Sequence, residues 1–137
     1  MIYETKVSYT IVDSKGNDKV VKESYIVEDA ETFCDAEQQT WGFFKDETGF
    51  DVTDIKRSKI KEIINTRNND EQKIFLADVA DITINDDGDK VEIIYKIALF
   101  AADLDAAYSN LKKHLEQGYS MTAIGVKKSN FVDIITY

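Results

Sequence analysis

The feature of this sequence that most constrains its fold is an internal duplication, because two copies of one pattern are expected to form the same local structure twice. Three segments of the first half recur in order at a shift of 71 residues: Lys19-Val20 as Lys90-Val91, residues 30–33 as residues 101–104, and residues 58–64 as residues 129–135. A fourth, residues 50–53, recurs as residues 119–122 with a small insertion between. The chain is therefore read as two repeats, at about residues 3–66 and 74–137.

Each repeat begins with the pattern of a β-hairpin. A strand of alternating apolar and polar residues leads into a polar turn that contains one glycine, and a second strand returns. In the first half these segments are residues 7–11, 14–18 and 20–27, and in the second half residues 80–84, 86–89 and 91–100. The glycine of each turn can adopt the positive φ that tight hairpin turns require.

Each hairpin is followed by a predicted helix whose N-terminus has a recognisable capping residue. Thr32 is the expected N-cap of the first helix, with Asp35 three positions on as in a capping box, and this helix should end by Gly49. Asp103 is the expected N-cap of the second helix, and Gly118 stands where a glycine C′ residue is typical.

Extended, β-type sequence follows each helix, at residues 50–66 and 119–137, and is read as either one long strand or a bent pair. The repeat is therefore a ββαβ unit. Since a unit of about 65 to 70 residues with one amphipathic helix is small for independent folding, the two copies should share a core. The sequence predicts an α+β fold in which a tandem duplication of a ββαβ unit forms one compact pseudo-twofold domain over residues 1–137.

Composition excludes several classes of protein. With 43% hydrophobic and 11% aromatic residues the chain is expected to fold, and its net charge of -9 comes from 17 Lys and Arg against 26 Asp and Glu. No apolar run reaches the length of a membrane span or of a signal peptide. Because there is one cysteine, no disulfide can form within the chain. We expect a cytoplasmic protein that has no membrane partner.

The sequence resembles a family of small uncharacterised proteins that carries only a domain-of-unknown-function label. The segments that carry the resemblance are residues 4–9 (ETKVSY), 25–30 (YIVEDA) and above all 50–59 (FDVTDIKRSK). The family is found in gut Bacteroidetes, their mobile elements and their phages, so the resemblance implies a bacterial cytoplasm or a phage-infected cell. It supplies no catalytic residues, and Cys34 stands where we expect a hydroxyl residue in that family.

No catalytic, metal or cofactor signature emerges. His114 is the only histidine and is expected to be a solvated residue at a helix end, while Cys34 has no evident partner base. Residues 85–89 resemble a calcium loop, but placing Gly88 at loop position six puts Ile94 where a bidentate Glu is needed, so a hairpin turn is favoured over weak cation binding. A glycine-built phosphate cradle is also absent. We therefore predict that the protein is not an enzyme and has no cofactor.

One basic segment, residues 56–61, stands out in an otherwise acidic chain. If this segment is extended, its alternate side chains project from one face about 6.5 to 7 Å apart, close to one nucleotide step. Tyrosines 3, 9, 25 and 95 could then stack on bases. The candidate nucleic-acid contacts are Lys56, Arg57, Lys59, Lys61, Arg67, Lys127 and Lys128. The alternative is that these lysines protect an edge strand from aggregation.

Two functional hypotheses follow. The first is a non-enzymatic accessory of phage or mobile-element DNA metabolism that binds single-stranded nucleic acid. The second is a protein-interaction module, an inhibitor or adaptor of host machinery, whose partner is a host or phage protein. Such a module would use an acidic surface for a basic partner, or an exposed strand edge for β-augmentation.

Overall fold

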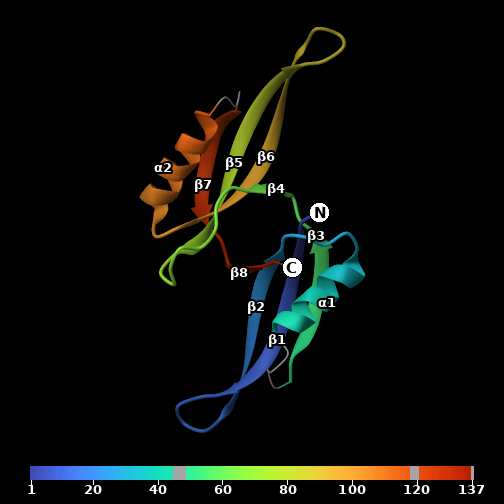
Figure 1. Cartoon of the computed structure of the whole chain (residues 1–137), viewed down its shortest axis with the longest axis vertical. Coiled ribbons are helices and arrows are strands. Elements are labelled where there is room, and N and C mark those ends of the chain that lie inside the picture. Colours follow the sequence, from blue (N-terminus) through green and yellow to red (C-terminus); the bar gives the residue numbers. More distant parts are fainter. Residues whose placement is uncertain (45–48, 118–120, 137) are drawn as a thin grey trace. The chain divides into compact units, whose positions relative to one another are not determined.

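The computed structural model describes residues 1–44, 49–117 and 121–136. In that part of the chain, eight strands and two helices follow one another (Figure 1): β1 (Tyr3–Val12), β2 (Asp18–Val27), α1 (Phe33–Phe43), β3 (Asp51–Arg57), β4 (Ile60–Ile63), β5 (Lys73–Ile84), β6 (Lys90–Ala101), α2 (Leu104–Leu115), β7 (Met121–Lys128) and β8 (Phe131–Ile135). The predicted α+β class is confirmed: the described residues form two β-sheets and two helices.

Both hairpin turns form as predicted, because the same local chemistry closes each of them. Asp13 Oδ1 accepts hydrogen bonds from the backbone N–H groups of the first turn, and Asn85 Oδ1 does the same in the second. Gly16 and Gly88 adopt φ angles of 80° and 81°, which residues with a Cβ rarely adopt.

The predicted helix starts are also confirmed. Thr32 Oγ1 accepts from Asp35 N at 3.1 Å, and Asp35 Oδ2 accepts from Thr32 N at 3.2 Å, so the capping box is complete. Asp103 Oδ1 accepts from Ala106 N at 2.8 Å at the start of α2. Gly118 lies outside the described residues.

The repeat register requires one correction. The turn glycines Gly16 and Gly88 are 72 residues apart, whereas the N-caps Thr32 and Asp103 are 71 apart. Counted from the turns, Lys19 therefore corresponds to Val91 and not to Lys90. The stretch from the turn glycine to the helix N-cap is one residue longer in the first half than in the second, so a match anchored on the helices is shifted by one in the hairpins. A one-residue offset matters, since it exchanges the two faces of a strand.

Of the two strands that follow each helix, the second pairs with the sheet of the other half of the chain. One sheet has the order β3-β1-β2-β8 and the other the order β4-β6-β5-β7. In the first, β8 pairs in parallel with β2; in the second, β4 pairs in parallel with β6. Each sheet thus takes one edge strand from the other half. Of the two alternatives for residues 50–66, the bent pair is observed, and its two strands lie in different sheets.

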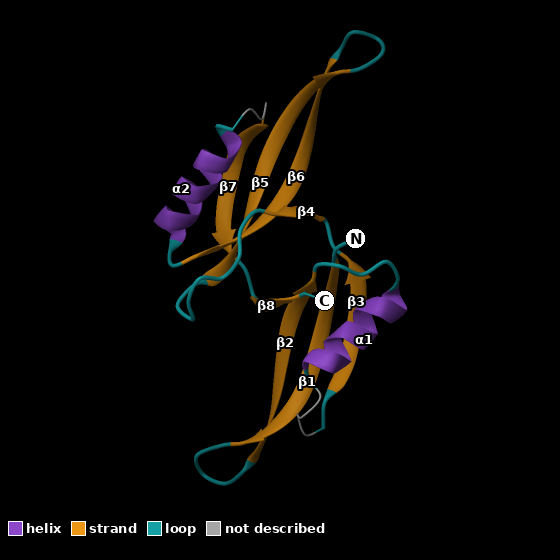
Figure 2. Ribbon diagram, viewed as in Figure 1, coloured by secondary structure: helices purple, strands orange, loops and turns teal. Residues whose placement is uncertain are grey.

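The chain forms two compact units that follow this exchange. Unit 1 comprises Met1–Ser58 and Asn130–Tyr137, and unit 2 comprises Lys59–Ser129. In each unit one helix lies against one face of the sheet (Figure 2) and covers a hydrophobic core. The core of unit 1 includes Ile135 of β8, which is 3% exposed, and Ile64, which follows β4, packs against the core of unit 2.

Fragment complementation tests the strand exchange. Residues 1–70 and 71–137, produced as separate chains, each lack an edge strand that the other supplies, so neither should unfold cooperatively alone. An equimolar mixture should gain β-sheet circular dichroism and one cooperative unfolding transition. Ile135→Asp in the second fragment should abolish this gain, because it places a carboxylate in the core of unit 1. Independent folding of both fragments would contradict the exchange.

A buried phenol in unit 1 makes stability sensitive to alkaline pH. Tyr25 is 4% exposed, and its hydroxyl donates to Glu23 Oε1 at 3.2 Å, which also accepts from Tyr9 at 2.5 Å. Burial, reinforced by the charge of Glu23, raises the pKa of Tyr25 far above its ordinary value. Above about pH 10 the unfolded chain therefore loses a proton that the folded chain retains.

The free energy of unfolding should consequently fall as the pH rises above about 10, by about 1.4 kcal/mol between pH 9 and pH 11 from this one group. Urea denaturation of the wild type and of Tyr25→Phe measures the difference between the two slopes, because other titrating groups contribute equally to both. Identical slopes would show that Tyr25 ionises as easily in the folded chain as in the unfolded one.

Candidate functional site

The predicted basic segment does not form one stripe. Backbone N–H of Ser58 donates to Ile2 O at 2.9 Å, where β3 ends, and β4 begins three residues after Arg57. Lys56 and Arg57 consequently belong to unit 1, whereas Lys59 and Lys61 belong to unit 2. The condition that the whole segment is extended along one strand is therefore not met.

The remaining candidate basic residues are also spread over different elements. Within unit 2, β4 and β7 form opposite edges of the sheet, so Lys59 and Lys61 lie across the sheet from Lys127 and Lys128. Several of these side chains already have partners within the protein. Lys56 Nζ is 3.8 Å from Glu4 Oε1, Lys61 Nζ lies 3.6 Å from the centroid of the Tyr95 ring, and the Arg67 guanidinium lies 5.2 Å from that of Phe100.

The prediction that Tyr3 and Tyr25 can stack on bases is wrong. These rings are 1% and 4% exposed, because both residues face α1 in the core of unit 1. Tyr9 and Tyr95 are partly buried against the two cores. Alternation along a strand reveals its two faces but does not indicate which face a helix covers, and this is why the sequence misassigned these residues.

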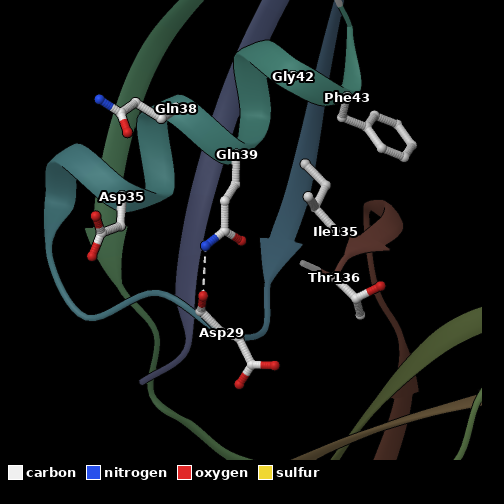
Figure 3. Close-up of a pocket in the computed structure, with 8 residues that line it drawn as sticks. All are labelled: Asp29, Asp35, Gln38, Gln39, Gly42, Phe43, Ile135 and Thr136. Carbon is white, nitrogen blue, oxygen red and sulfur yellow. Dashed lines mark hydrogen bonds between the residues drawn. The ribbon is translucent and has the colours of Figure 1, made fainter.

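A groove lies in unit 1 among the described residues. It runs between α1 and the edge strand β8, has a volume of about 720 Å³ and is drawn in Figure 3. Its lining residues are Asp29, Asp35, Gln38, Gln39, Gly42, Phe43, Ile135 and Thr136. Pockets of about 300 to 1,000 Å³ are the usual size for ligand recognition.

Polar groups of the groove are held in defined positions. Gln39 Nε2 donates to the backbone oxygen of Asp29 at 2.6 Å, which ties α1 to the end of β2 (Figure 3). Gln39 Oε1 is buried and has no hydrogen-bond partner among the described residues. Asp35 is fixed by the capping box, whereas Asp29 is exposed. Phe43, half exposed, packs one side of its ring against Tyr25.

Unit 2 has a smaller groove in the corresponding place, between α2 and the end of β4. Its volume is about 400 Å³, and its lining residues are Ile64, Asn65, Asn68, Asn110, Lys113, His114 and Gln117. At the edge of the sheet, the side chain of Asn65 makes the two backbone hydrogen bonds that a neighbouring strand would make. It accepts from Phe100 N at 2.7 Å and donates to Phe100 O at 2.9 Å.

His114 differs from its expected state. Its side chain is only 20% exposed, and Nε2 lies 2.6 Å from Glu62 Oε1, so it connects α2 to β4 rather than projecting into solvent. Helical spacing identified its place near the end of α2, but the facing strand comes from the other half of the chain, which local pattern does not reveal. Cys34 is exposed in the first turn of α1.

No pattern in the sequence indicated the unit 1 groove itself. Its lining residues are of common types, and the strand that borders it is distant in sequence from α1. In the part of the chain that is described, neither helix is long and apolar enough to span a membrane.

Comparison with known protein families gives a match over the whole chain. A family model described as Domain of unknown function (DUF4494) matches residues 1–137, and the chain belongs to this family. The resemblance to an uncharacterised domain-of-unknown-function family is confirmed at this level. No curated protein matches the chain.

Proposed function

We propose that this member of the DUF4494 family is a non-enzymatic protein-interaction module that binds an extended segment of a partner protein between α1 and β8. The groove of about 720 Å³ is the observation that carries this proposal. A groove bounded by a helix on one side and an edge strand on the other suits an extended peptide, because the strand edge offers backbone groups and the helix offers side-chain contacts.

Unit 2 provides an internal precedent for such an occupant. There, the corresponding groove is partly filled by the segment that follows β4, and Asn65 of that segment bonds to the backbone of Phe100. In unit 1 the groove is wider, and Ile135 and Thr136 are the lining residues that come from β8 and its end. A partner segment in unit 1 would occupy the space that corresponds to the one partly taken up in unit 2 by the segment after β4.

The same topology supports two finer parts of the proposal. Each sheet has its hairpin in the middle, the strand after its helix on one side, and a parallel strand from the other half on the other side. This supports a tandem duplication of a ββαβ unit. A bacterial or phage setting, with a host or phage protein as partner, is the part of the proposal that rests on resemblance alone.

Binding of single-stranded nucleic acid stays a prediction that the geometry supports less well. Its seven candidate residues are divided between the units, Tyr3 and Tyr25 are buried, and the net charge is -9. These features weaken both base stacking and attraction to phosphates.

Gly42 allows the groove to be blocked without disturbing the fold. It lies in α1 and lines the groove, and a Cβ built there meets no heavy atom within 4 Å. Gly42→Ala should raise the free energy of unfolding by up to about 1 kcal/mol, because alanine favours helix. Gly42→Trp should fold equally well, as thermal unfolding would verify, while its indole occupies the groove.

The binding test uses peptides selected on the wild-type protein from a displayed library of random sequences, with Gly42→Ala as matched control. We expect selected peptides to bind wild type and Gly42→Ala alike and to lose at least about tenfold in affinity on Gly42→Trp, measured by fluorescence anisotropy. A library without binders, or peptides that bind Gly42→Trp normally, would refute this function. Tight binding of a thymidine oligonucleotide in the same assay would instead favour the nucleic-acid hypothesis.

A further inference from the structure

We infer that the partner segment taken up by the α1–β8 groove is basic, with lysine or arginine side chains directed at its acidic rim. This inference rests on the proposed function and specifies the chemistry of its partner. The segment from residue 28 to residue 43, which includes α1, contains five carboxylates and no lysine or arginine: Glu28, Asp29, Glu31, Asp35 and Glu37. Two of them, Asp29 and Asp35, line the groove itself.

The charge of Asp29 is available to a ligand. Its side chain is exposed, its backbone oxygen is held by Gln39, and it makes no ion pair with any described residue. In Figure 3 its carboxylate points away from the Gln39 hydrogen bond. A cationic side chain of a bound segment can therefore approach Asp29 without displacing an existing partner.

Three lysines of the same sheet face away from this rim. Tyr3, Thr5 and Val7 of β1 are buried on the face that α1 covers, so the alternate residue Lys6 projects from the opposite face. Lys22 and Lys56 pair with Ser8 and Glu4 of β1 and lie on that opposite face too. Unit 1 thus carries these three cations on one side of its sheet and the groove on the other.

Two further groups suit a lysine or arginine. Phe43 is 50% exposed in the groove, and its ring presents a face on which a cation can rest. The protein makes this type of contact within unit 2, where Lys61 lies 3.6 Å from the centre of the Tyr95 ring. In addition, Gln39 Oε1 is a buried acceptor without a partner among the described residues, and an N–H donor of the ligand would satisfy it.

The corresponding groove of unit 2 has the opposite character. Lys113 lines it, and its described lining residues include no carboxylate. A basic segment therefore meets no acidic rim there, and the preference belongs to unit 1.

The experiment uses the full chain and one synthetic peptide scaffold, a threonine- and valine-rich strand former with three variable positions filled by Lys, Gln or Glu. Fluorescence anisotropy at low and high salt should give at least about tenfold tighter binding for the Lys peptide than for the Gln peptide at low salt. The ratio should shrink at high salt, because exposed charges are screened, and the Glu peptide should bind weakest. Asp29→Asn should lower the Lys-to-Gln ratio several-fold.

Asp54→Asn is the matched control, because it removes the same charge from an exposed residue of β3 that pairs with Lys6. It should leave the ratio unchanged. Equal binding of the Lys and Gln peptides would overturn the basic preference while leaving the groove function intact, and an equal effect of the two Asp variants would overturn the assignment to the groove rim. If no peptide binds and the library yields no binders, the proposed function itself fails.

Discussion

The parallel pairing of β8 with β2 is the interaction on which the groove and its chemistry depend. Ile134 and Ile135 pair with Ile26 and Val27, and Glu28 N donates to Ile135 O at 3.1 Å. Without this strand β2 would be the edge of the sheet, and α1 would have no neighbour across the groove. Since Ile135 is also part of the core of unit 1, the same strand completes the hydrophobic core and builds the binding surface. Loss of β8 would therefore cost stability and recognition together.

Much of the secondary structure could be predicted because its causes are local. An aspartate or asparagine beside a turn glycine specifies each hairpin, and Thr32 and Asp103 specify where the helices begin. These residues act within a few positions of themselves, so periodicity and capping rules are sufficient to find them. The sheet partners of β4 and β8 are not local in this sense. Their pairing with β6 and β2 depends on contacts between the two halves of the chain, for which a single sequence carries no short-range signal.

The candidate site was predicted less well than the fold for the same reason. The nucleic-acid hypothesis required residues 56–61 to be extended along one strand, but the chain leaves the first sheet at Ser58 and enters the second at Ile60. The sequence thus identified the basic residues but did not show that they are divided between the two units. Acidity and an exposed strand edge were recognised as features of an interaction module, but the groove that combines them depends on the tertiary position of α1 beside β8.

Side chains explain why the two grooves differ in volume. Gln39, Gly42 and Phe43 precede Asn110, Lys113 and His114 by 71 residues, and each set lines the groove of its own unit. In unit 2, His114 approaches Glu62 of β4 to 2.6 Å and joins the helix to the strand. Phe43 is neutral and makes no such ion pair, while Gly42 leaves open space where Lys113 has a long side chain. The two units therefore have grooves of different volume, about 720 Å³ in unit 1 and about 400 Å³ in unit 2, and the larger groove is the one lined by carboxylates.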